Sequence, residues 1–118
     1  MEEVDGYMLE EVDVSELRTG DMIWDQYCTL PVKWMAVTVE ARPDGRYRVS
    51  TYSGENDVSS PRAFGRRAGL ADDRTLMERW SRGDAHHDQI EHLIGRKFLC
   101  RTDGRIFKTA KGEQLLGR

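Results

Sequence analysis

Apolar and polar residues alternate most regularly over residues 32–53, and this period of two predicts a β-hairpin. The turn is expected at residues 42–45, where Pro43 presets the first corner and Gly45 can adopt a positive φ. A glycine bulge after this turn places Arg42 opposite Arg46 and sets the register. The opposed pairs are then Val37 with Thr51, Val39 with Val49 and Ala41 with Tyr47 on the core face, and Ala36 with Tyr52, Thr38 with Ser50 and Glu40 with Arg48 on the solvent face.

The period changes to that of a helix between residues 72 and 94, where two short helices are predicted. Asp72 or Asp73 is a suitable N-cap for the first helix, which is expected to end near Arg82 with Gly83 beyond it. We expect Asp84 to start the second helix, which Gly95 ends. The apolar positions of the two helices are Leu76, Met77, Trp80, Ile90, Leu93 and Ile94.

The remaining segments are less regular. An extended segment is expected near the N-terminus, followed by a short buried strand at residues 22–24, and the first 16 residues are expected to form an acidic arm. Residues 54–71 lose the alternation and are rich in Gly, Ser, Pro and Arg, which predicts a mobile loop with at most a short strand near Val58. A second hairpin is expected around the turn Asp103-Gly104, and Leu115 and Leu116 would then add a closing strand or turn.

These elements together predict an α+β fold: a small, strongly bent antiparallel sheet with two short helices inserted. The stretch Leu17-x-x-Gly20-Asp21-x-Ile23, followed by a strand and a tight hairpin, resembles small SH3-like β-barrels over about residues 14–53. The resemblance implies a partial barrel and a binding module. The small size, the Arg-rich composition and the lack of catalytic motifs also resemble accessory proteins of actinobacteria or their phages.

Length and charge narrow the expected classes of protein. A chain of 118 residues is expected to form a single domain. It has no apolar run long enough for a membrane helix and an acidic N-terminus, so we expect a cytoplasmic protein without a membrane partner. Residues 1–25 carry a net charge of −8 and the remainder +5, a division that favours protein partners over a general nucleic-acid surface.

Enzymatic and metal chemistry have little support in the sequence. All three histidines lie in residues 86–92, but His87 and His92 are five apart, whereas zinc-binding helices need a spacing of four. Asp88 and His92 have that spacing and remain a weak metal-enzyme alternative. Cys28 and Cys100 have no C-x-x-C spacing and are interpreted as buried, reduced thiols. We therefore expect no cofactor and no catalytic residues.

The leading hypothesis is a non-enzymatic module that binds a protein. Trp34 and Tyr52 fall on the solvent face of the first hairpin with Arg48, and exposed aromatic and arginine residues are frequent at binding hot spots. The alternative is that the two predicted helices pack over this face through Met77 and Trp80 and bury both aromatic residues. The acidic segment is a second candidate surface, as a mimic of nucleic-acid phosphates. An exposed Trp34 face is equally compatible with a homodimer contact.

Nucleic-acid binding is the main alternative. Three arginines and one aromatic residue lie among glycines in residues 62–69, a composition suited to phosphate contacts and base stacking. The second hairpin is also basic. The residues assigned to this alternative are Arg62, Phe64, Arg66, Arg67, Arg101 and Arg105.

Overall fold

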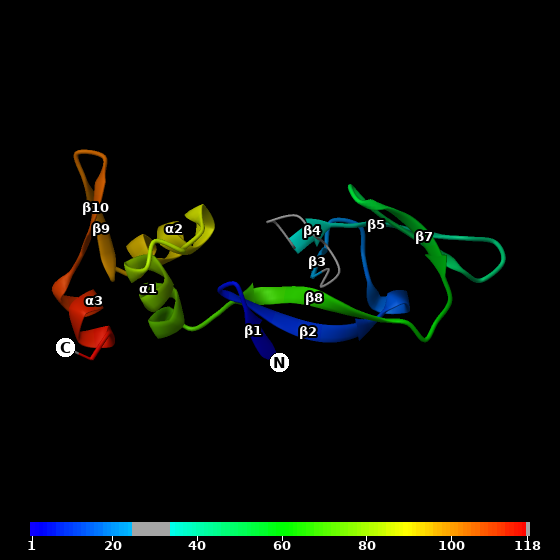
Figure 1. Ribbon diagram of the computed structural model, residues 1–118, viewed down its shortest axis with the longest axis horizontal. Helices are drawn as coiled ribbons and strands as arrows, with labels where there is room; N and C mark the ends of the chain where they lie inside the picture. The colour runs from blue at the N-terminus through cyan, green and yellow to red at the C-terminus, as the bar shows by residue number, and fades with distance from the viewer. Residues whose placement is uncertain (25–33, 118) are drawn as a thin grey trace. The chain divides into compact units, whose positions relative to one another are not determined.

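The computed structural model describes residues 1–24 and 34–117, in which antiparallel strands predominate and three α-helices occur, in agreement with an α+β fold (Figure 1). The chain forms two compact units, which are considered separately. The first unit contains Met1–Glu2 and Met8–Gly69, and the second contains Glu3–Tyr7 and Leu70–Arg118. No helix in the described part of the chain is long and apolar enough to span a membrane.

A five-stranded sheet includes the acidic N-terminal residues. Its order is β1-β2-β8-β3-β4, so β2 lies between two other strands. The predicted N-terminal arm is therefore wrong, because Tyr7 and Val12 of β2 are buried and hold this segment in the sheet. The strands of this sheet are β1 (Glu2–Val4), β2 (Tyr7–Asp13), β3 (Met22–Trp24), β4 (Trp34–Ala36) and β8 (Ala63–Leu70), and a 3-10 helix at Val14–Glu16 follows β2.

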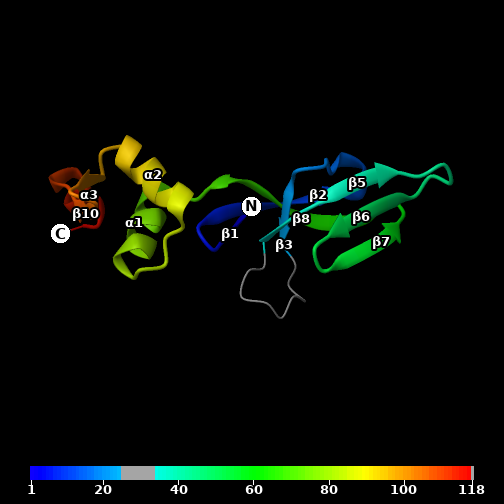
Figure 2. The same cartoon turned by 90° about the horizontal axis from the view of Figure 1, so that it is seen from above.

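A second sheet of three strands contains the predicted hairpin (Figure 2). It is formed by β5 (Thr38–Ala41), β6 (Tyr47–Thr51) and β7 (Gly54–Val58). The predicted register is confirmed over β5 and β6, with Val39 opposite Val49 and Glu40 opposite Arg48.

The loop predicted for most of residues 54–71 is wrong, because β7 and β8 occupy most of this range, whereas the short strand allowed near Val58 is present as β7. Most of β7 is exposed to solvent, so its sequence lacks the alternation that marks a half-buried strand.

The chain from Trp34 to Ala41 serves both sheets. Its first three residues form β4 and pair with β3, and its last four form β5 and pair with β6. Val37 lies between them, where its N–H donates to Asp21 O and its carbonyl accepts from Gly20 N–H, both within 3.0 Å. The predicted pairs of Val37 with Thr51 and Ala36 with Tyr52 are therefore absent from the ladder. The core of the first unit is formed by Val12, Val14, Leu17, Ile23, Val37 and Val49, with Val39, Tyr47, Val58 and Phe64 packed against it.

The second unit is built from helices and one hairpin. The first helix is confirmed with Asp72 as its N-cap, and Gly83 follows its end with a φ of +79°. The N-cap of the second helix is His86, two residues later than the expected Asp84. The elements of the second unit are α1 (Asp73–Ser81), α2 (His87–Gly95), β9 (Leu99–Thr102), β10 (Arg105–Lys108) and α3 (Ala110–Leu115).

The C-terminal end of the chain differs from the expectation. Leu115 is the last residue of α3 rather than part of a strand or turn, whereas Leu116 lies in the turn that follows the helix. The Thr109 side chain caps this helix by accepting from Gly112 N–H, so a polar cap rather than the Leu pair defines the element.

Candidate functional site

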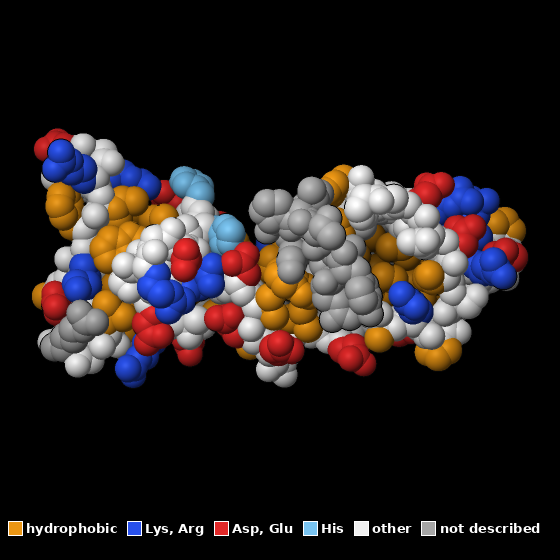
Figure 3. All heavy atoms as spheres, in the orientation of Figure 1, with side chains coloured by type: hydrophobic (Ala, Val, Ile, Leu, Met, Phe, Trp, Pro, Cys, Tyr) orange, Lys and Arg blue, Asp and Glu red, His pale blue; other side chains and the backbone are white. Residues whose placement is uncertain are grey.

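The outer face of the β5–β6–β7 sheet carries polar and charged side chains. The Arg48 guanidinium donates to both carboxylate oxygens of Asp57, over 3.0 and 3.4 Å, across the β6–β7 pair. This hydrogen bond lowers the pKa of Asp57 and raises that of Arg48. Glu40 lies opposite Arg48 as predicted, but its carboxylate pairs with Arg42 instead, at 3.1 Å. Figure 3 shows acidic and basic side chains gathered together at the end of the first unit that carries the β5–β6 turn.

The two predicted aromatic contact residues have different environments. Tyr52, in the turn between β6 and β7, is 59% exposed. Trp34 is only 4% exposed, so the expectation that it faces solvent is wrong. Alternation places Trp34 on the outer side of the hairpin, but β4 leaves that hairpin for β3, where the Trp24 ring lies 5.3 Å away and the Arg67 guanidinium lies 4.7 Å above the indole. Trp34 is thus not available as a surface anchor in this structure.

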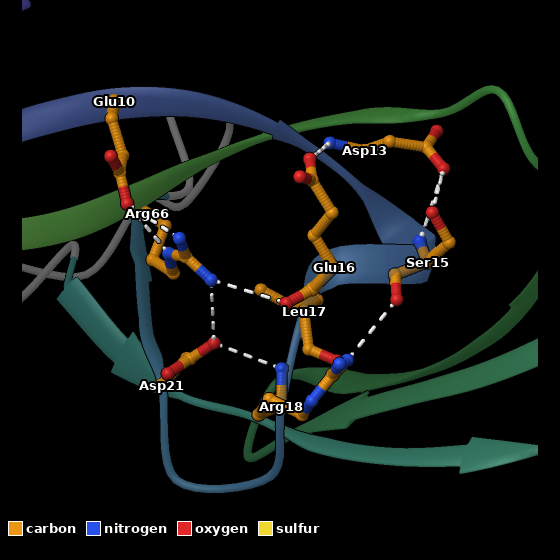
Figure 4. A network of polar contacts seen from close by, with 8 residues as sticks. All are labelled: Glu10, Asp13, Ser15, Glu16, Leu17, Arg18, Asp21 and Arg66. Atoms are coloured by element: carbon orange, nitrogen blue, oxygen red, sulfur yellow. Dashed lines mark hydrogen bonds and ion pairs between the residues drawn. The ribbon is translucent and has the colours of Figure 1, made fainter.

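Arg66, assigned above to a phosphate-binding surface, lies within a network of internal contacts (Figure 4). Its Nε and Nη2 donate to Glu10 Oε1 over 2.9 and 2.6 Å, and its Nη1 donates to the Glu16 carbonyl over 3.1 Å. The same Nη1 lies 3.4 Å from Asp21. These contacts raise the pKa of Arg66, chiefly through the hydrogen bond to Glu10. The guanidinium joins β2, the 3-10 helix, the turn before β3 and β8, and its donors are engaged inside the protein.

The other residues of the predicted Arg-rich site do not form one surface. Phe64 packs against the core of the first unit rather than forming an open stacking platform. The Arg62 guanidinium lies 5.8 Å from the Phe64 ring centroid, and the Arg67 guanidinium covers Trp34. These residues and Arg66 were assigned to one surface because they are close in the sequence. Along a strand such as β8, however, neighbouring side chains point to opposite faces of the sheet.

The second hairpin presents a mixed face. Arg101 forms an ion pair with Glu91 of α2, and this hydrogen bond lowers the pKa of Glu91. Arg105 is exposed on the other face of the hairpin with Phe107, which is 48% exposed. Cys100 lies opposite Phe107 and is also exposed, so the prediction of a buried thiol is wrong for Cys100. Cys28, the other cysteine, lies outside the described residues.

Both members of the proposed metal pair have protein partners. The Tyr7 hydroxyl donates to Asp88 Oδ1 over 2.7 Å, and His92 Nε2 lies 2.9 Å from Asp73 Oδ1. A group of three or more metal-binding side chains is not found over residues 1–24 and 34–117. Asp88 and His92 therefore contribute to contacts between elements of the second unit, Asp88 through β2 and His92 through α1.

Three residues at the edges of the β5–β6–β7 sheet were not among the predicted site residues. Thr19 forms two hydrogen bonds with the backbone of Val39 in β5. Glu55 and Asp57 lie in β7, at the opposite edge. A short strand near Val58 was allowed, but its full extent from Gly54 to Val58 was not, because this strand is mostly exposed and lacks alternation.

The chain matches no family model, no curated protein and no solved structure.

Proposed function

We propose that the protein is a non-enzymatic accessory module that binds a protein partner through the outer side of the β5–β6–β7 sheet. The observation that carries this proposal is Tyr52, a large aromatic side chain that is 59% exposed in the β6–β7 turn, at the end of the strand that carries the Arg48–Asp57 ion pair. Tyrosine and arginine are enriched at the centres of protein interfaces, because they combine a large contact area with polar groups. Trp34, being buried, is no longer part of the proposed surface.

The wider fold is compatible with this role. The stretch of residues 34–41 contributes β4 to one sheet and β5 to the other, so a single segment of chain joins the two sheets. A strongly bent, SH3-like partial barrel requires such a connection. The internal engagement of Arg66 and Arg67 removes much of the support for the Arg-rich phosphate site. A protein partner is therefore favoured for the first unit.

The test is an affinity pull-down from source cells with wild type, Tyr52→Ala and Phe107→Ala, each treated with nuclease and checked for folding. We expect a discrete protein to bind wild type and Phe107→Ala, and its affinity for Tyr52→Ala to fall at least about tenfold, as at a hot-spot residue. Equal capture by Tyr52→Ala and wild type contradicts the proposed surface.

A second candidate is nucleic-acid binding by the β9–β10 hairpin, where Arg105 and Phe107 are exposed on one face. The same samples without nuclease test it. Nucleic acid retained by wild type and Tyr52→Ala but lost from Phe107→Ala supports this candidate. Its binding would also weaken steeply with salt, because phosphate contacts release counterions.

A further inference from the structure

The two outer edges of the β5–β6–β7 sheet differ in whether their outward backbone groups have hydrogen-bond partners. In an antiparallel pair, residues alternately direct their N–H and C=O toward and away from the neighbouring strand. The Arg42 N–H donates to Arg46 O over 2.7 Å, which sets this alternation and directs the backbone groups of Val39 away from β6. Thr19 Oγ1 accepts from Val39 N–H over 2.9 Å and donates to Val39 O over 3.2 Å. One side chain therefore satisfies both outward backbone groups of Val39 at the β5 edge.

The β7 edge is open by the same reasoning. The same alternation continues across β6 into β7. The backbone N–H and C=O of Asn56 therefore point toward Val49 of β6, and the backbone N–H and C=O groups of Glu55 and Asp57 point away from the sheet. Both residues are exposed, and no backbone hydrogen bond within the described part of the chain uses their outward N–H and C=O groups. This edge offers two donors and two acceptors to an added strand.

Charge argues against a second copy of β7 as that strand. In an antiparallel pair of β7 strands, the residues with outward groups must face each other, so Glu55 or Asp57 of one copy lies opposite Glu55 or Asp57 of the other. Like charges directly opposite each other in a sheet are destabilising. Asp57 is already paired with Arg48, whereas the Glu55 carboxylate accepts a 3.4 Å hydrogen bond from the Ser50 hydroxyl and forms no ion pair with any described residue. It can therefore pair with a basic residue of a different chain.

We propose that β7 binds an extended segment of a protein partner by antiparallel strand addition, with a Lys or Arg of that segment opposite Glu55. This inference rests on the proposed protein-binding function and specifies its partner chemistry. Main-chain hydrogen bonds to Glu55 and Asp57 supply affinity, and the cross-strand charge pair selects the register.

The experiment uses the full chain and an acetylated, amidated peptide of sequence Thr-Val-Thr-Lys-Thr-Val-Thr, with a matched peptide that has Glu in place of Lys. NMR would follow amide hydrogen exchange during titration. At a peptide concentration about ten times Kd, exchange of the Glu55 and Asp57 amides should slow about tenfold, because only the unbound state exchanges. The amide of Asn56, which already faces β6, should change less.

Variants at Glu55 test the backbone and charge contributions. Glu55→Gln removes the charge alone, whereas Glu55→Pro also removes an outward N–H at a position where an edge strand tolerates proline, and Glu55→Pro should bind the Lys peptide at least about fivefold more weakly than Glu55→Gln. Glu55→Lys should reverse the preference, so that the Glu peptide binds more tightly than the Lys peptide. Glu11→Lys, an equal charge change at an exposed position of β2, should preserve the original preference.

The proposal is overturned if the Lys peptide protects neither amide, or if Glu55→Lys leaves the preference unchanged. It is also overturned if both amides become protected when protein concentration rises without peptide, because β7 then pairs with itself. A partner that still depends on Tyr52 in the pull-down while the β7 amides remain unprotected would leave the protein-binding function standing and exclude strand addition.

Discussion

Asp13 joins two segments that lie 47 residues apart in the chain. Its carboxylate accepts from the Ser15 N–H and hydroxyl, from the Ser60 hydroxyl at 2.6 Å and from the Arg62 N–H at 2.7 Å. These donors stabilise the ionised form and hold the pKa of Asp13 far below its usual value, with the Ser15 bond as the largest cause.

This lowered pKa predicts a specific dependence of stability on pH. The contribution of Asp13 is fully present above the ordinary carboxyl value of 3.8, and is lost as pH falls below 3.8 toward the folded pKa. We expect Asp13→Asn to lower the urea midpoint at neutral pH and the difference from wild type to narrow at about pH 2.5. Asp103→Asn in the β9–β10 turn is the control. A difference that stays constant with pH would show that ionised Asp13 does not stabilise the fold.

At the scale of elements, α3 depends on one glycine. A Cβ at Gly112 would lie 2.3 Å from the Phe98 carbonyl oxygen and 2.9 Å from the Met77 methyl group. The same carbonyl accepts from the Thr109 N–H at the start of α3. The helix can lie against this backbone because residue 112 has no side chain.

We therefore expect Gly112→Ala to lower the free energy of unfolding by about 1–3 kcal/mol, as overpacking does, although alanine favours a helix. Gly95→Ala, the last residue of α2, meets nothing within 4 Å and should be neutral or stabilise by up to about 1 kcal/mol. Urea unfolding of both variants measures the contrast. Equal effects at the two positions would mean that helix propensity, rather than packing, decides the result.

At the scale of the whole molecule, the second unit includes residues from near both ends of the chain. Gln89 of α2 is fully buried, and its Nε2 donates to the Asp5 carbonyl over 3.0 Å while its Oε1 accepts from the His86 N–H over 3.1 Å. The first of these bonds joins residues 84 apart. Asp5 also accepts from Arg79 of α1 at 2.7 Å. The turn before β2 is thus part of the helical unit.

Gln89→Met keeps most of the side-chain volume but leaves the two backbone groups without this partner. We expect it to lower stability by about 2–4 kcal/mol, because unsatisfied buried groups cost more than the net value of a hydrogen bond. Gln114→Met, at an exposed position of α3, should change stability little. Hydrogen exchange of the α1 and α2 amides is the measurement. Unchanged exchange in Gln89→Met would contradict the assigned role.

The sequence by itself determined those features that depend on neighbouring residues. The Pro43-Asp44-Gly45 turn set the β5–β6 register, Asp103-Gly104 set the second hairpin, and Asp72 set the start of α1, because turn and cap chemistry acts over a few residues. The exposure of Tyr52, by contrast, could not be decided from alternation, because Tyr52 lies in the β6–β7 turn beyond the paired part of the hairpin.

The tertiary structure alone decided which strands meet and which polar groups find partners. Trp34 is buried because β4 pairs with β3, and Arg66 is engaged because β8 passes Glu10 of β2, 56 residues away. The acidic N-terminus became strands of a sheet for the same reason. Such pairings depend on the path of the whole chain, and neither residue composition nor local periodicity specifies that path.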